Sequence, residues 1–158
     1  MFRELRRPKQ ALSKEQCIEV LKAAPRGILS MLGDDGYPYG IPLTHYYDEE
    51  SGKIYFHGAA EGHKIDAIKG CDKVSFCVLD KGYKNEGDWV WHTNSVIVFG
   101  RIHFVEDHTK ALQMCVKLAK KHTDSPEYVK NELESSGHKV LALELEIEHI
   151  SGKAVNEC

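Results

Sequence analysis

Hydrophobic and polar residues alternate along several segments of the chain, which is the pattern of half-buried β-strands. The clearest alternation runs from Leu141 to Glu148, where three leucines and an isoleucine take every second position. Glycine-containing turns at 33–36 and 49–52 separate earlier apolar segments and indicate hairpin connections. We therefore expect six strands. The other five lie at residues 27–32, 37–48, 54–56, 73–79 and 95–105.

Other segments repeat their apolar residues at helical spacing. Ser13 and Gln16 form a capping-box pattern, and the helix that follows should end at Pro25. A short helix is expected from His63 onward, because Ile65 and Ile68 fall on one face. Asp107 is a suitable cap for a helix that reaches about residue 122. A second short helix should start at Ser125–Pro126.

This order of elements predicts a mainly β fold, a six-stranded antiparallel barrel with flanking helices. Strict alternation of strand and helix is absent, so a doubly wound parallel sheet is not expected. Pro38 and Pro42 cannot donate to a sheet ladder, which indicates an edge or a bulge in the strand at 37–48. Gly100 indicates a bend or bulge in the strand at 95–105. The length of 158 residues fits one domain, residues 1–158, preceded by a basic arm at 1–12.

Composition narrows the class of protein. The net charge is −3, which disfavours nucleic-acid binding because that function needs clustered positive charge. The five cysteines are widely spaced without a Cys-x-x-Cys pair, so neither a zinc knuckle nor a dithiol redox motif is indicated. No apolar run is long enough to span a membrane, and charged residues directly after Met1 disfavour a signal peptide. We expect a cytoplasmic protein.

The stretch from Tyr55 to Lys69 combines a strand, a glycine-bearing loop and the start of a helix. This arrangement is common at phosphate sites, because free backbone N–H groups and the positive end of the helix dipole face the anion. Gly58 and Gly62 allow close approach, and Lys64 lies in the first helical turn, where an anion would offset its charge. The spacing differs from a Walker A loop. The alternative reading is a plain turn with a solvated lysine.

Two tryptophans and two histidines lie at positions where they could contact a ligand or simply pack within the protein. Trp89 and Trp91 lie in a polar segment, residues 80–93, where large aromatic rings suggest packing on a partner chain or a ligand. His57 and His63 flank the glycine loop, yet no third residue has suitable spacing, so no metal site is predicted. As an isolated residue, His57 would more often be a surface or packed histidine than a catalytic one.

Five sequence blocks in this order resemble the pyridoxamine 5′-phosphate oxidase-like, FMN-binding split-barrel superfamily, and within it the nitroimidazole-resistance-type flavoproteins. The likeness extends from about Arg26 to Lys153. The blocks are residues 36–43, 55–64, 73–76, 94–100 and 146–153. The arginine-rich phosphate and substrate motifs of the oxidase itself are not evident, so we do not expect pyridoxamine phosphate to be the substrate.

The resemblance implies a homodimer that holds FMN at the subunit interface, with the flavin phosphate at residues 57–64. It also implies that residues 42–44 line the isoalloxazine and that the Trp89–Trp91 segment crosses the interface. Strand hydroxyls such as Thr44 and Ser95 would donate hydrogen bonds to the flavin, or would simply pack against neighbours. The implied cofactor-binding residues are Pro42, Leu43, Thr44, His57, Gly58, Ala59, Gly62, His63, Lys64, Asn94 and Ser95.

The function implied is an FMN-dependent oxidoreductase that passes electrons from a reduced nicotinamide to a small acceptor, such as a nitroaromatic compound or another flavin. His57 is the candidate catalytic residue, because a histidine titrates near neutral pH and can orient an acceptor or supply a proton. One alternative is a non-catalytic FMN- or haem-binding protein of the same fold. Another is an interaction domain that has lost its ligand, which the presence of Gly58, Gly62 and Lys64 disfavours.

Overall fold

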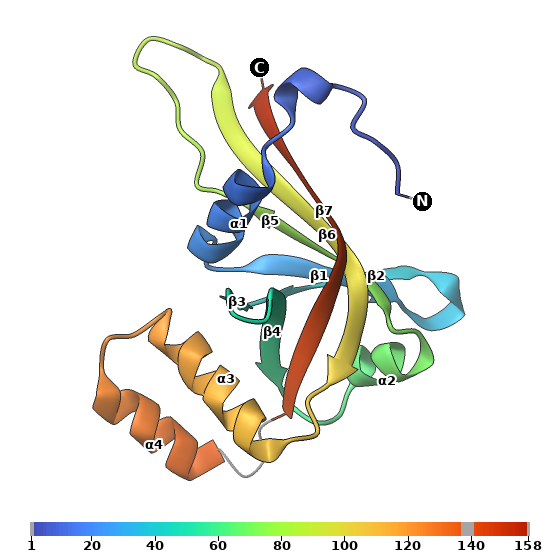
Figure 1. Ribbon diagram of the computed structural model, residues 1–158, viewed down its shortest axis with the longest axis vertical. Helices are drawn as coiled ribbons and strands as arrows, with labels where there is room; N and C mark the ends of the chain where they lie inside the picture. Colours follow the sequence, from blue (N-terminus) through green and yellow to red (C-terminus); the bar gives the residue numbers. More distant parts are fainter. Residues whose placement is uncertain (1, 137–140, 158) are drawn as a thin grey trace.

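The computed structural model describes residues 2–136 and 141–157, and its strands form one antiparallel sheet that curves into a barrel (Figure 1). The strand order is β2-β1-β5-β6-β7-β4-β3. The strands are β1 (Gly27–Leu32), β2 (Pro38–Leu43), β3 (Tyr46–Asp48), β4 (Lys53–Gly58), β5 (Lys73–Leu79), β6 (Trp91–Phe104) and β7 (Leu141–Glu157). The α-helices are α1 (Lys14–Ala23), α2 (His63–Gly70), α3 (His108–Lys120) and α4 (Pro126–Ser136), and Pro8–Gln10 and Asp34–Gly36 form short 3-10 turns.

The predicted mainly β antiparallel fold with flanking helices is confirmed, but the sheet has seven strands instead of six. The expected strand at 37–48 divides into β2 and β3, which lie at opposite edges of the sheet. Thr44 and His45 form the crossing between them. The His45 ring is fully buried and its Nε2 lies 2.7 Å from the Leu21 carbonyl oxygen. This contact with α1 draws the chain out of the first edge and toward the second.

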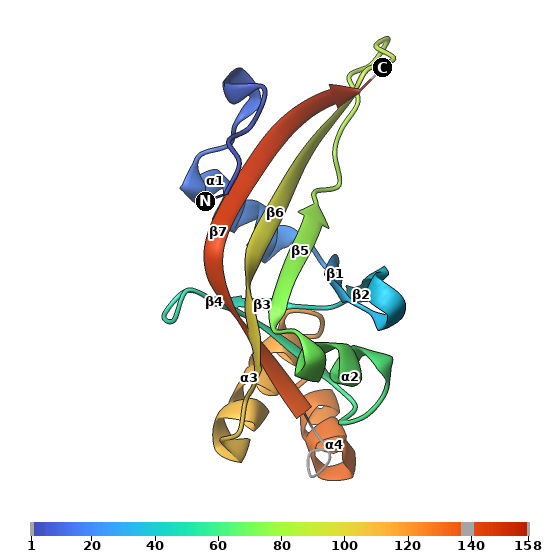
Figure 2. The same cartoon turned by 90° about the vertical axis from the view of Figure 1, so that its right-hand side faces the viewer.

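Strands β6 and β7 form the long spine of the molecule (Figure 2). Their pairing extends from Trp91–Glu157 to Phe104–Leu143, with a register shift between Phe99 and Gly100 that confirms the predicted bulge. Both strands are longer than expected, since β6 begins at Trp91 rather than Ser95 and β7 continues to Glu157. Pairing with the end of β7 places residues 91–93 in β6, although they belong to the polar segment 80–93 that was expected to be a loop.

Three other local predictions are confirmed: the capping box of α1, the cap of α3 and the edge position of Pro42. Ser13 and Gln16 form the full capping box of α1, and the Asp107 carboxylate accepts hydrogen bonds at the start of α3. Pro42 lies in an edge strand, paired only with Ile28 of β1. Edge-to-face packing of Phe56 and Phe76, whose centroids are 5.0 Å apart, lies within the barrel core.

The helices surround the barrel unevenly. Helix α1 packs along β6 and β7, whereas α3 and α4 form a hairpin beside β4 (Figure 1). Helix α2 lies between β4 and β5 in the chain and approaches β1. None of the helices within residues 2–136 and 141–157 combines the length and apolar character needed to cross a membrane.

Candidate functional site

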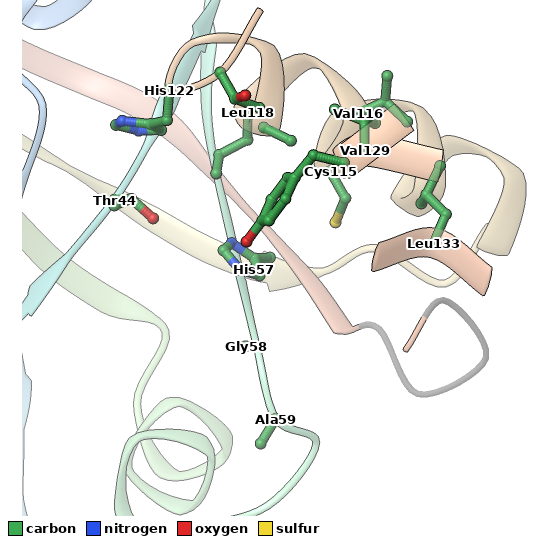
Figure 3. Close-up of a pocket in the computed structure, with 13 residues that line it drawn as sticks. Thr44, His57, Gly58, Ala59, Cys115, Val116, Leu118, His122, Val129 and Leu133 are labelled. Carbon is green, nitrogen blue, oxygen red and sulfur yellow. The ribbon is translucent and has the colours of Figure 1, made fainter. Parts of the chain in front are cut away.

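A cavity of about 740 Å³ lies between the end of β4 and the α3–α4 hairpin (Figure 3). The strand side supplies Thr44 and His57, and the helical side supplies aliphatic side chains together with His122, Thr123 and Tyr128. The lining residues are Thr44, His57, Gly58, Ala59, Cys115, Val116, Leu118, Ala119, His122, Thr123, Tyr128, Val129 and Leu133. A cavity of this size with few polar groups is typical of a site for a small organic molecule.

The electrostatic character of the cavity is close to neutral. Among the described residues, no lysine, arginine, aspartate or glutamate lines it. Burial raises the pKa of the Cys115 thiol to about 11, so this cysteine stays protonated and is a poor nucleophile at neutral pH. Burial also lowers the pKa of His122, with a smaller effect of Lys121, and so favours its neutral form.

A cradle formed by Gly58, Gly62, Lys64 and the start of α2 adjoins the cavity at Gly58, the last residue of β4. A Cβ atom placed on Gly58 would lie 2.5 Å from Lys64 Nζ, so the lysine side chain folds back over this glycine. Burial lowers the pKa of Lys64, and it is the only cause of the shift. Within residues 2–136 and 141–157, no carboxylate offsets this partly buried ammonium group. The lysine is therefore placed to gain an anionic partner.

The start of α2 strengthens this cradle. Gly62 is the N-cap residue, with φ +112°, and no side chain caps the helix. The amide groups of Ile65 and Asp66 donate to the Gly62 carbonyl oxygen. The amides of His63 and Lys64, at the helix start, therefore have no carbonyl partner within the helix. A helix N-terminus without a side-chain cap, a glycine at positive φ and a partly buried cation together fit a phosphate group.

His63 points away from this cradle. Its ring stacks on Tyr39 of β2, with centroids 4.1 Å apart, and its Nε2 lies 3.5 Å from an Asp34 carboxylate oxygen. The side chain thus holds α2 against the β1–β2 turn. Only the backbone of His63 is placed at the helix start.

The structure brings together part of the residue set that the sequence suggested. Thr44, His57, Gly58 and Ala59 line the cavity. Gly62 and Lys64 belong to the adjoining cradle. The remaining members, Pro42, Leu43, Asn94 and Ser95, lie outside the cavity lining.

These remaining members have other surroundings within one chain. Leu43 packs against the hydrophobic core, and Pro42 is exposed on the edge strand. The Asn94 side chain donates to Asp80 at 2.8 Å, at the base of the loop between β5 and β6. Ser95 is paired within the sheet with Leu79 and Lys153. Their contact with a cofactor stays a prediction.

Sequence reasoning missed the helical wall of the cavity. Cys115 and Ala119 lie at helical spacing on an apolar face of α3, and such spacing by itself predicts packing against the core. The structure buries Ala111, Met114 and Leu118 of this helix and leaves the neighbouring positions partly open. The periodicity shows that a face is apolar, but it does not show whether that face meets protein or a cavity.

The sequence alone also did not predict a polar contact between His45 and Lys121. His45 and Lys121 lie together, and Lys121 Nζ donates to the carbonyl oxygens of Ala24 and His45 at 2.7 and 3.2 Å. Burial lowers the pKa of His45 to about 4 and that of Lys121 to about 8. These contacts join the end of α1, the β2–β3 crossing and the end of α3.

In the part of the chain that the structure describes, no group of three acidic, histidine or cysteine residues could hold a metal ion.

Solved structures share this fold at low sequence identity. A protein assigned to 5-nitroimidazole antibiotic resistance from Bacteroides thetaiotaomicron superposes with a TM-score of 0.76 and 16% identity, covering 92% of this chain and 87% of that one. An FAD-binding protein from Mesorhizobium loti gives 0.65 and 24%, covering 92% and 97%. An FAD-binding protein from Mycobacterium smegmatis gives 0.62 and 17%, covering 92% and 98%. Comparison with curated proteins gave no match.

The fold and the site define a small antiparallel split barrel with a partly buried lysine at a helix start, beside a cavity whose described lining holds no lysine, arginine, aspartate or glutamate. The model of the pyridoxamine 5′-phosphate oxidase family matches residues 13–154. The chain belongs to this family, which confirms the resemblance seen in the sequence.

Proposed function

We propose that this protein is an FMN-dependent oxidoreductase that reduces a small acceptor, such as a nitroaromatic compound or a flavin, with electrons from a reduced nicotinamide. The observation that carries the proposal is the partly buried Lys64 ammonium group, which lies over Gly58 without a carboxylate partner among the described residues. Two of the structurally similar proteins are FAD-binding, which supports a flavin as the ligand. One lysine and one helix N-terminus suit a single phosphate group, which favours FMN.

When bound, the flavin would supply hydride acceptance and onward electron transfer. The residues of this chain would bind the flavin phosphate, orient the ligand and protonate the acceptor. Lys64 and the start of α2 would hold the phosphate, and Gly58 would let it approach the backbone. Thr44 and His57 lie at the strand side of the cavity (Figure 3), where Thr44 would orient the ligand through its hydroxyl and His57 would supply a proton to the acceptor.

The proposal includes a homodimer with the flavin at the interface. Across the outer face of the sheet, Ile28, Cys77 and Ile97 are consecutive cross-strand partners. Both isoleucines are about 40% exposed, at 43% and 40%. Nearby apolar residues with large exposed areas are Leu32, Leu79, Trp89, Trp91 and Phe99. A second copy of the chain would cover this face and bring Asn94 and Ser95 toward the site of the partner.

The decisive experiment is a comparison of FMN and riboflavin binding by equilibrium titration. We expect Lys64→Ala to weaken FMN by about 1.5–3 kcal/mol, the range for a hydrogen bond to a charged group, and to leave riboflavin nearly unchanged. Lys69→Ala is the matched control, because it removes the same charge from the exposed last turn of α2. Equal losses for both ligands in Lys64→Ala would remove the phosphate assignment.

Anaerobic titration with NADH and NADPH separates turnover from binding alone. An oxidoreductase should lose its flavin absorbance on addition of one of the two nucleotides and recover it when the acceptor is added. A flavin that stays oxidised throughout, or a haem spectrum in place of a flavin one, would favour a non-catalytic FMN- or haem-binding protein.

A further inference from the structure

We propose that the cavity between β4 and the α3–α4 hairpin is the acceptor site, and that it selects flat, uncharged molecules with one hydrogen-bond-accepting end while excluding phosphorylated and other anionic substrates. This inference rests on the proposed function and specifies its substrate class. It also predicts that this cavity does not accept a phosphorylated substrate, although the name of the family would suggest one.

The position of the cavity makes it accessible to a molecule that exchanges electrons with a ligand in the cradle. Gly58 belongs to both, because it lines the cavity and also lies under Lys64 Nζ. His57 and Ala59, its two neighbours in the chain, line the cavity as well. A ligand anchored at Lys64 and a second molecule in the cavity would therefore meet at the end of β4.

The lining distributes its polar groups unevenly. Thr44, His57 and His122 lie toward one end of the cavity, and Val116, Val129 and Leu133 lie toward the other (Figure 3). Thr123 and Tyr128 add hydroxyl groups to the lining. The end at Val116, Val129 and Leu133 thus offers apolar surface to a ring, and the opposite end offers hydroxyl and imidazole groups to a polar substituent. A nitro or quinone-type group on an aromatic body has this division.

Charge defines what the cavity excludes. Within residues 2–136 and 141–157, no lysine or arginine lines it. Lys64 reaches the cavity only at Gly58, where its charge would be paired with the phosphate of the cradle ligand, so a second anion in the cavity would have no cationic partner. Lys121, which follows α3, is engaged with the carbonyl oxygens of Ala24 and His45. The Cys115 thiol stays neutral because burial raises its pKa. An anionic substrate would lose its hydration in this cavity without compensation.

The test uses two probes that differ in charge: menadione and a naphthoquinone sulfonate of similar size. Isothermal titration of each probe into wild-type protein, with and without FMN, should show menadione bound at least about tenfold more tightly. Ala119→Leu fills the cavity from α3 and should weaken menadione about tenfold or more. Gln113→Leu is its control, because it adds similar apolar bulk at an exposed position of the same helix outside the cavity.

A variant that binds one probe more tightly cannot be explained by disturbed folding, so a second test looks for a gain of sulfonate binding. Leu133→Arg places a cation in the cavity and should strengthen sulfonate binding by about tenfold or more, the converse of the penalty for an unpaired buried anion. Asn131→Arg adds the same charge to an exposed position of α4 outside the lining and should leave the probe preference unchanged.

Equal affinity of wild-type protein for the two probes, or menadione binding that is unaffected by Ala119→Leu, would overturn the assignment of the cavity. FMN binding is measured on each variant in parallel. Failure of wild-type protein to bind FMN, with the probe preferences as expected, would overturn the proposed flavin function while leaving the ligand class of the cavity intact.

Discussion

Lys64 and His57 would have separate tasks, although Gly58 links their surroundings. Lys64 would anchor an anion through its charge, whereas His57 faces the neutral cavity from the strand side. The local sequence predicted the cradle, because a strand, two glycines and a helix start at short spacing restrict where Lys64 can lie. It did not predict the orientation of His63, whose ring stacks on Tyr39 of a different strand.

At this scale, His57→Ala should leave FMN bound and slow the reoxidation of reduced flavin by a nitroaromatic acceptor. A positioned general acid typically contributes 10²–10⁴-fold, and we expect a decrease toward the lower end, about 100-fold. Stopped-flow absorbance of prereduced protein mixed with the acceptor measures this rate. An unchanged rate in the variant, with flavin still bound, would exclude His57 from the mechanism.

Among the elements, the periodic ones were predictable and the irregular ones were not. Alternation in 141–148 and the caps at Ser13 and Asp107 act locally, so the sequence alone revealed them. The break at Thr44–His45 depends on the buried contact between His45 and Leu21, which is remote in the chain. The helical wall of the cavity depends on how α3 and α4 are placed against β4, which no local pattern specifies.

Glu144 of β7 forms ion pairs and hydrogen bonds with residues of β4 and α3. Its carboxylate accepts hydrogen bonds from Lys53 and Lys110, each at 2.8 Å, and from the Tyr55 hydroxyl at 3.2 Å. Burial by itself would raise the pKa of Glu144, but the hydrogen bonds from Lys110 and Lys53 outweigh it and lower the pKa from 4.5 to about 2. The carboxylate therefore links β7 to β4 and α3.

We expect Glu144→Gln to lower the free energy of unfolding by about 1.5–3 kcal/mol at neutral pH. Because the folded pKa is depressed, the contribution of the charged group is complete above pH 4.5 and is lost as the pH falls toward 2. Urea unfolding of both proteins should therefore show a difference that narrows with acidification. Glu146→Gln, at an exposed position of the same strand, is the control. A difference that is independent of pH would contradict the charge-based account.

For the whole molecule, we predict a homodimer assembled on the outer sheet face. Sedimentation at micromolar concentration should give about twice the chain mass of 17.9 kDa. Ile97→Glu places a charge in the middle of this face and should produce monomers that bind FMN weakly, because interface cores tolerate charge poorly. Gln113→Glu, on the exposed side of α3, should stay dimeric. A wild-type monomer that holds FMN tightly would refute a site shared between two chains.

The central claim, that a flavin phosphate lies at Lys64 and the start of α2, is tested most directly by phosphorus NMR of FMN bound to the wild-type protein. The dianion of a free phosphate monoester takes up a proton near pH 6 and becomes a monoanion. A phosphate held by the Lys64 ammonium group and the helix N-terminus should stay dianionic well below that pH, so the resonance of bound FMN should not titrate between about pH 7 and 5. A bound FMN whose phosphate titrates as it does in free solution would contradict the account.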